Sequence, residues 1–172
     1  MHRKELLSWT RYILIPLVVM LSIRTFLVSP IVVDGDSMQP TFESGDVVII
    51  AKRATVERFQ LIVFRHTSAD YLMIKRVIGM PGDTLAMQED VLYINDVAYE
   101  EPYVFQAPFM THQTENFTLA HIANVSVIPE GHYIVLGDYR LKSRDSRHFG
   151  LVRAEDVEGV VKWRVLNNWT AF

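Results

Sequence analysis

The chain has 172 residues and a mass of 19.8 kDa, which suits one domain with an appendage. Its 17 basic and 20 acidic residues give a formal net charge of −3, and this balance disfavours a uniformly basic nucleic-acid-binding protein. Cysteine is absent, which excludes a disulfide framework, a thiolate zinc site and a cysteine nucleophile. The 49% hydrophobic content argues against long disordered regions.

The N-terminal end is basic and apolar, unlike the acidic remainder. Four basic residues, Arg3, Lys4, Arg11 and Arg24, stand there against Glu5 alone. The stretch from Tyr12 to Ile23 is uncharged but shorter than the ~20 residues that span a bilayer. Extending it to Leu6 or Val28 admits one arginine near an end, where its long side chain can reach the headgroups.

We therefore predict that residues 1–29 form a cytoplasmic N-terminus with one transmembrane helix. Residues 30–172 then form an extracytoplasmic β-rich domain, and the protein is a single-pass protein of the cell membrane. Two alternatives are a cleavable signal peptide and a buried core helix. No Ala-x-Ala-like cleavage site follows Ile23, which disfavours the signal peptide.

Beyond Pro30, short runs rich in Val, Ile, Tyr and Phe alternate with Gly, Asp, Asn and Pro. The predicted strands are Ile31–Val33, Asp46–Ala51, Gln60–Arg65, Tyr71–Ile78, Thr84–Gln88, Val91–Ile94, Tyr133–Leu136 and Val157–Val165. Met80–Asp83 has the chemistry of a type II turn, and Asn95–Asp96 that of a tight hairpin. The fold class is thus mainly β, with antiparallel sheets folded over or forming a partial barrel.

Residues 103–117 contain several aromatic side chains without a clear period. We expect a loop or ribbon excursion from the β domain. It either packs onto the same domain, which we favour, or contacts a membrane surface.

Two short stretches carry candidate chemistry. Ser37 lies on a Gly- and Pro-containing turn directly after an apolar strand, where a hydroxyl can be presented at the strand end. In the predicted strand Tyr71–Ile78, both faces are apolar except for Lys75 on one and Arg76 on the other. Burial lowers the pKa of a lysine, and a neutral amine can act as a general base, whereas arginine stays protonated.

Together these residues suggest a Ser–Lys dyad, a variant of serine nucleophile activation. The six histidines are scattered and none shows the spacing of a metal site. We therefore predict no metal, no cofactor and no nucleic-acid partner.

Four blocks in this order resemble bacterial type I signal peptidases. They are Ser37-Met-Gln-Pro-Thr41, Ser44-Gly-Asp-Val-Val48, Lys75 to Asp83, and Gly137 to Gly150. The resemblance covers about residues 30–163, and it implies a membrane-bound serine endopeptidase that cleaves signal peptides from exported preproteins after small residues. The lipid bilayer and preprotein signal peptides are the implied partners.

The resemblance also implies roles for individual residues. Ser37 matches the nucleophile, Lys75 the general base, and Ser143 the hydroxyl that orients the lysine amine. Asp145 and Arg147 match a block that supports the site. The implied substrate-binding residues are Met38, Ile74, Val33 and Leu72, with Ser29–Val33 and Leu72–Ile74 as edges for an extended substrate.

Two positions depart from the pattern of many members. Tyr139 stands where an asparagine is common, and Gly35 stands where some members have a serine that helps to hold the oxyanion. Gly35 and the single anchor resemble the Gram-positive branch. Two other readings remain open, namely a catalytically idle anchored β domain that binds exported chains, and a related self-cleaving Ser–Lys peptidase.

Overall fold

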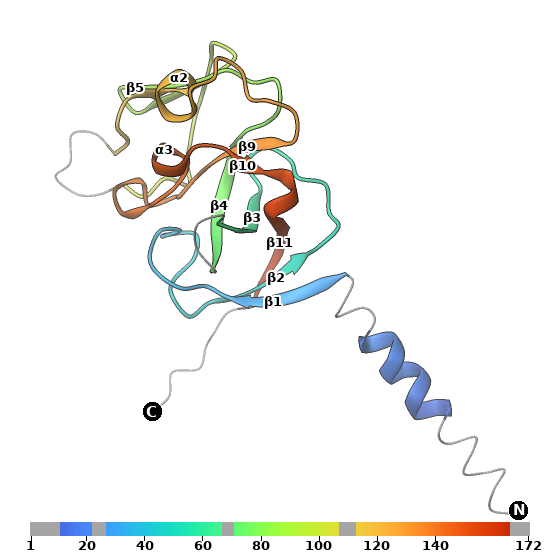
Figure 1. The fold of residues 1–172 in the computed structure, drawn as a ribbon. Coiled ribbons are helices and arrows are strands. Elements are labelled where there is room, and N and C mark those ends of the chain that lie inside the picture. The colour runs from blue at the N-terminus through green and yellow to red at the C-terminus, as the bar shows by residue number, and fades with distance from the viewer. Residues whose placement is uncertain (1–10, 22–26, 67–70, 107–112, 166–172) are drawn as a thin grey trace, which may run out of the picture.

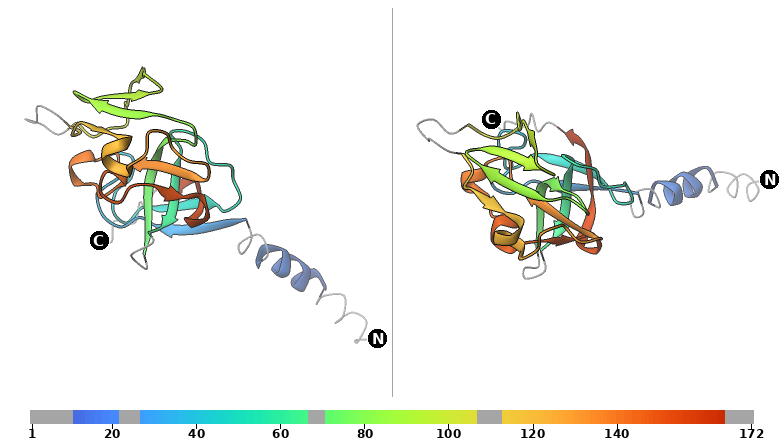
Figure 2. Two further views of the ribbon diagram at one scale, coloured as in Figure 1. Left: turned by 45° about the horizontal axis from the view of Figure 1, so that its top comes forward. Right: turned by 90° about the horizontal axis from the view of Figure 1, so that it is seen from above.

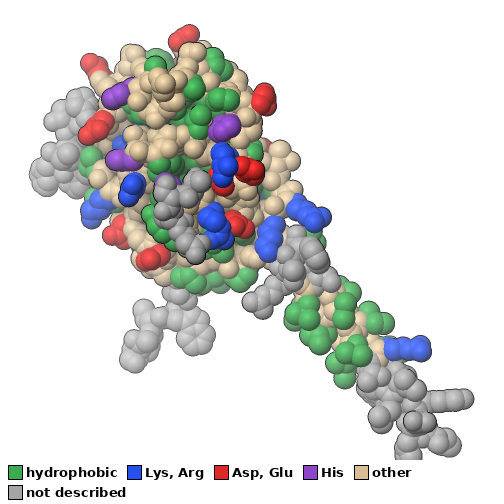
Figure 3. All heavy atoms as spheres, in the orientation of Figure 1, with side chains coloured by type: hydrophobic (Ala, Val, Ile, Leu, Met, Phe, Trp, Pro, Cys, Tyr) green, Lys and Arg blue, Asp and Glu red, His purple; other side chains and the backbone are tan. Residues whose placement is uncertain are grey.

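The computed structural model describes residues 11–21, 27–66, 71–106 and 113–165. Residues 11–21 form a helix with exposed apolar side chains, drawn apart from the β body in Figures 1 and 2 and rich in green side chains in Figure 3. None of the helices within the described residues combines the length and apolarity that crossing a bilayer requires. Residues 1–10 and 22–26 of the predicted anchor lie outside the described residues, whereas Val28 and Ser29 already belong to the first strand of the β body.

The larger sheet has seven antiparallel strands in the order β1-β2-β11-β3-β4-β9-β10. Their bounds are β1 Val28–Val32, β2 Val47–Ala51, β3 Leu61–Arg65, β4 Leu72–Gly79, β9 His132–Leu136, β10 Val152–Arg153 and β11 Val157–Val165. Three short helical turns follow β9 or β10, at η1 (Arg140–Lys142), α3 (Ser146–Phe149) and η2 (Ala154–Asp156). The prediction of a mainly β fold with antiparallel sheets is confirmed.

The smaller sheet has four strands in the order β7-β6-β5-β8. It comprises β5 (Leu85–Gln88), β6 (Val91–Ile94), β7 (Val97–Tyr99) and β8 (Phe117–Thr118), and the short helix α2 (Leu119–Ala123) follows it. Asn95 and Asp96 both have positive φ, as a tight hairpin between β6 and β7 requires. Gly82 has φ +87° in the turn that leads from β4 to β5, which agrees with the predicted type II turn.

The predicted strands correspond to observed strands, with shifts at the ends. The first one begins three residues earlier than predicted, because Pro30 is tolerated on β1, an edge strand. The predicted hairpin at Asn95–Asp96 indicated β7 as its second arm, whereas β8 and β10 were not predicted, because two residues each carry too little pattern to recognise.

The larger sheet folds over a buried cluster that lies next to the turn carrying Ser37. Side chains from β2, β3 and β4 meet there with residues of the loop that follows β1. The buried members are Val33, Met38, Phe42, Val48, Ile50, Val63 and Ile74. This packing brings the loop after β1 against β4, although the two are far apart in sequence.

The two edges of β4 are paired over different stretches. β3 pairs with Leu72 through Arg76, whereas β9 pairs with Arg76, Val77 and Gly79 on the other side. Within the described part of the chain, Leu72–Lys75 therefore have one unpaired edge. β1 likewise ends the strand order of its sheet, so its outer edge is unpaired too.

The predicted excursion at 103–117 is described at its two ends. Val104 and Phe117 are buried, and Phe117 belongs to β8, which pairs with β5. These ends pack onto the domain, as the favoured alternative expected. Residues 107–112 of the excursion lie outside the described residues.

Candidate active site

The hydroxyl of Ser37 and the amine of Lys75 lie within hydrogen-bonding distance of each other. Nζ of Lys75 is 2.7 Å from Oγ of Ser37 and 3.0 Å from the carbonyl oxygen of Ile74. Lys75 comes from the middle of β4, and Ser37 from the turn that follows β1. The amide of Tyr139 donates to the carbonyl oxygen of Ser37 at 3.0 Å, which holds this turn to the loop after β9.

Lys75 is buried, with 3% of its surface exposed. Its neighbours on the same face of β4, Met73 and Val77, belong to a buried apolar cluster. Desolvation of the amine lowers the pKa of Lys75 from 10.5 to about 8, although the negative charges of Asp145 and Asp138 act in the opposite direction. A substantial fraction of the amine is therefore neutral near neutral pH and can accept a proton.

A groove of about 590 Å³ runs beside the two residues. One wall is formed by the end of β1 and the loop after it, and the other by Tyr71 and the first residues of β4. The two unpaired strand edges thus face the same groove. Lys142 and Arg144, from the loop after β9, also line it.

The predicted substrate-binding residues all line this groove. Met38, Val33 and Ile74 are 1%, 4% and 8% exposed and pack in one cluster below it, whereas Leu72 is 37% exposed. The groove floor is therefore apolar near Ser37.

Ser143 lies in the loop after β9 and is buried. Its hydroxyl is not bonded to the Lys75 amine, and it contributes to the lowered pKa of the neighbouring Asp145 carboxyl. This loop lies close to the Ser37 turn at Gly137. A Cβ atom added at Gly137 would stand 2.1 Å from Oγ of Ser143 and 2.6 Å from the carbonyl oxygen of Ser37. A glycine at 137 therefore lets the Ser143 loop approach the Ser37 turn.

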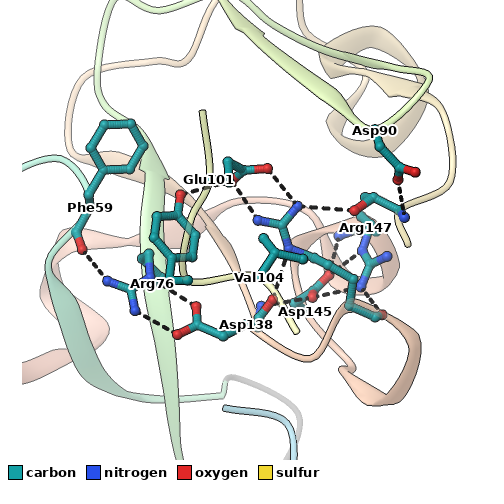
Figure 4. Close-up of polar contacts among 12 residues, drawn as sticks. Phe59, Arg76, Asp90, Glu101, Val104, Asp138, Asp145 and Arg147 are labelled. Atoms are coloured by element: carbon teal, nitrogen blue, oxygen red, sulfur yellow. Dashed lines mark hydrogen bonds and ion pairs between the residues drawn. The ribbon is translucent and has the colours of Figure 1, made fainter. Parts of the chain in front are cut away.

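Asp145 and Arg147 form a bidentate ion pair behind this loop (Figure 4). Nε of Arg147 is 2.8 Å from Oδ1 of Asp145, and its NH2 group is 2.9 Å from Oδ2. Burial would raise the pKa of Asp145, but the hydrogen bonds and charge of Arg147, with a bond from the Gly137 amide, hold it below its ordinary value. Asp145 also caps α3. The pair fixes the loop rather than contacting the groove, and Arg147 is not among the groove-lining residues.

Sequence reasoning left two further ion pairs out of the candidate site. Arg76 pairs with the fully buried Asp138, with Nε 2.9 Å from Oδ1 and NH2 2.6 Å from Oδ2 (Figure 4). The hydroxyl of Thr41, four residues after Ser37, donates to the same carboxylate. The alternation of apolar residues in β4 did indicate that a cation is buried there, but no sequence signal names its partner 62 residues away.

The second pair joins Arg140 to Glu101. Both NH groups of Arg140 contact the carboxylate, at 3.0 and 2.5 Å, and its Nε donates to the carbonyl oxygen of Gly137 at 2.9 Å. Arg140 is 2% exposed. The segment after β7 is thereby tied to the loop after β9. Among the described residues, no group of three or more His, Asp or Glu side chains could hold a metal ion.

Comparison with known proteins identifies a family for this chain. The model of the family described as signal peptidase, peptidase S26, matches residues 6–166. A signal peptidase I of Bacillus caldolyticus is 40% identical over 153 residues, covering 85% of this chain and 84% of the relative. A signal peptidase IB of Staphylococcus aureus strain Mu50 is 35% identical over 173 residues, covering 94% and 90%.

A crystal structure of a signal peptidase I from Enterococcus faecalis V583 is similar in fold. It has a TM-score of 0.59 and 37% sequence identity, and the match covers 63% of this chain and 98% of that one. The family model spans most of the chain. The matches to relatives above 30% identity cover most of this chain and most of each relative. The chain therefore belongs to the signal peptidase family, peptidase S26, and is a serine peptidase of the signal peptidase I type.

Proposed function

We propose that this peptidase is a membrane-anchored endopeptidase in which Ser37 is the nucleophile and Lys75 the general base. The observation that carries the proposal is the 2.7 Å contact between a serine hydroxyl and a buried amine whose pKa is lowered to about 8. Serine activation needs a base within hydrogen-bonding reach, and here the amine is the group in that position. The substrates are exported preproteins, cut after a small residue.

The reaction follows from the positions of these two groups. The neutral amine of Lys75 accepts the Ser37 proton as Oγ attacks the carbonyl carbon of the scissile peptide bond. The resulting ammonium ion then donates its proton to the leaving amine, and the C–N bond breaks to leave an acyl-enzyme. A water molecule attacks the ester with Lys75 again acting as base, which releases the signal peptide and restores Ser37.

The oxyanion of the tetrahedral intermediate needs hydrogen-bond donors. Gly35 offers no side-chain hydroxyl, so the backbone N–H of Ser37 is the donor that we propose. Asp138, with Arg76 and Thr41, positions the nucleophile turn rather than touching the substrate.

The substrate binds in the groove as an extended strand. The unpaired edges of β1 and of Leu72–Lys75 offer backbone groups for pairing, and alternate side chains of the substrate enter the apolar floor. Met38, Val33, Ile74 and Leu72 receive the small side chains that precede the cut, because these residues form the apolar lining next to Ser37.

Residues 1–29 anchor the enzyme with its N-terminus in the cytoplasm, and residues 30–172 lie on the outer side of the cell membrane. The apolar, exposed side chains of the helix at residues 11–21 and the basic flank of the segment support this proposal. Anchoring enzyme and preprotein in one bilayer raises their effective concentration.

The decisive experiment incubates the purified full-length chain, in detergent, with a labelled preprotein. The wild-type chain should release the mature protein, and Ser37→Ala should release none although its circular dichroism spectrum is unchanged. Ser126→Ala is the matched control, because Ser126 is exposed and lies outside the groove.

Other results identify the other readings. Binding of the preprotein without cleavage by the wild-type chain indicates an idle β domain. Cleavage of the chain itself, with the preprotein intact, indicates a self-cleaving peptidase. Extraction of the full-length chain from membranes by alkaline carbonate would contradict the anchor.

A further inference from the structure

Two basic side chains stand at the end of the groove where the proposed dyad lies. Lys142 and Arg144 flank the buried Ser143, and both are exposed and line the groove. Nζ of Lys142 is 5.2 Å from the centre of the Tyr139 ring, and neither cation forms an ion pair with a described residue. The other basic residues of this loop, Arg140 and Arg147, are paired with Glu101 and Asp145.

The topology places this loop after the scissile bond. β4 runs from Leu72 at the open end of the groove to Lys75, beyond which β9 occupies the free edge by pairing with Arg76. The loop that leaves β9 at Gly137 therefore closes the groove beside Lys75. A substrate that lies along Leu72–Ile74 before the cut must pass over this loop after the cut.

The surface beyond the loop also supports a path for the substrate over Lys142 and Arg144. A second hollow of about 190 Å³ lies next to it, and Lys142, Ser143 and Arg144 line this hollow as well as the groove. The two cations thus form a ridge between the hollows. Arg147 and His148 add to the basic character of the second hollow, and Glu115 is its one acidic lining residue.

The opposite wall of the groove carries negative charge. Asp34 and Asp36 line it on the turn that holds Ser37, and Asp36 accepts a hydrogen bond from Gln39 at 3.1 Å. Charge is therefore divided across the groove, with acidic groups on the nucleophile turn and basic groups on the loop after β9. A side chain on the leaving part of the substrate that points to the loop meets two cations without counterions.

We propose that Lys142 and Arg144 form the subsite for the first two residues after the cut and favour an acidic side chain there. The inference rests on the proposed function, because it assumes cleavage next to Ser37. Exposed ion pairs are weak, so the preference is a modest bias and not an absolute requirement. It is screened by salt.

The test uses preprotein peptides that differ only in the first or second residue after the cut, which is Asp, Ala or Lys. The full-length enzyme in nonionic detergent is assayed for kcat/KM on each peptide. We expect the Asp peptide to exceed the Lys peptide about tenfold at low ionic strength, since two cations attract one and repel the other. The ratio should fall below about twofold for the double variant Lys142→Gln/Arg144→Gln, and also in about 0.5 M salt.

The matched control is Arg53→Gln/Lys162→Gln, which removes the same charge from exposed positions outside the groove. It should leave the tenfold ratio unchanged. A wild-type ratio near one, or a preference that persists in Lys142→Gln/Arg144→Gln, overturns the subsite. A third result also overturns the subsite and favours headgroup binding. In it, Lys142→Gln/Arg144→Gln leaves the ratio of kcat/KM for the Asp and Lys peptides unchanged, and the variant loses activity only in vesicles that contain anionic lipid. Failure of the wild-type enzyme to cut any peptide overturns the proposed function itself.

Discussion

Lys75 and Arg76 are neighbours on β4, yet the fold treats them in opposite ways. Arg76 receives a bidentate carboxylate from Asp138, a carbonyl oxygen from Phe59 and the ring of Tyr103 at 4.0 Å. Lys75 contacts a hydroxyl and a carbonyl oxygen, and no carboxylate of the described residues lies within ion-pairing distance of its amine. One cation is stabilised in its charged form, and the other is not.

The difference shows how a β-strand can hold a structural cation and a base side by side. Consecutive residues leave opposite faces of the strand, so each side chain has its own environment. An arginine cannot lose its proton, and its burial therefore needs a partner. When a lysine is buried without a carboxylate partner, desolvation of the ammonium form lowers its pKa, and the neutral amine can then act as a base.

The largest difference in kcat/KM is expected when Lys75 is replaced by arginine and, in a separate variant, Arg76 is replaced by lysine. Lys75→Arg should reduce kcat/KM on a preprotein at least about a thousandfold, because a guanidinium cannot accept the Ser37 proton. Arg76→Lys keeps a charge that can still pair with Asp138, and it should cost less than about tenfold. Near-normal turnover by Lys75→Arg would exclude Lys75 as the base.

Removing the counterion should cost stability on the Arg76 side. Asp138→Asn leaves a largely buried guanidinium without its negative partner, and the free energy of unfolding should fall by about 3–5 kcal/mol. Urea denaturation of wild type and variant measures this loss. Asp156→Asn is a control, because Asp156 pairs with Arg153 near the surface, and its loss should be below about 1 kcal/mol. Equal losses of unfolding free energy in Asp138→Asn and Asp156→Asn would contradict the proposed dependence of Arg76 on its buried counterion.

The Lys75 side predicts a dependence of stability on pH. The unfolded chain binds the Lys75 proton up to about 10.5, whereas the folded chain releases it at about 8. Between these values the unfolded state binds more protons, so stability rises with pH, by about 3 kcal/mol in total. Below about pH 8 both states bind the proton, so the stability does not change with pH through Lys75.

Stability measured from pH 7 to 11 checks this prediction. The Lys75-linked rise should vanish in Lys75→Met, so the difference between wild type and variant isolates it from other titrating groups. In the same range, kcat/KM of the wild-type enzyme should increase through a pKa of about 8, because only the neutral amine accepts the proton. A profile without this rise would contradict the lowered pKa.

The smallest stability effect is expected at Ser143. Its hydroxyl has at most a weak contact with Asp145, so Ser143→Ala should change the free energy of unfolding by less than about 1 kcal/mol. We nevertheless expect kcat to fall about tenfold, because the free hydroxyl is available to the ammonium ion that forms on Lys75. Unchanged kcat would restrict Ser143 to packing.

Much of the fold followed from local pattern. The strand runs, the turn at Gly82 and the hairpin at Asn95–Asp96 depend on nearest neighbours, and these were predicted. The two-residue strands β8 and β10 were not, because pairing in the folded sheet defines them rather than their own composition. The anchor and the residue roles stay predictions.

The sequence by itself determined that a hydroxyl follows an apolar strand and that a cation is embedded in an apolar one. Only the tertiary structure decided that these groups, 38 residues apart, meet at 2.7 Å, and that the available carboxylate at 138 pairs with Arg76 instead of Lys75. The physical reason is that a pattern along the chain records burial, whereas the distance between two charges depends on which strands become neighbours.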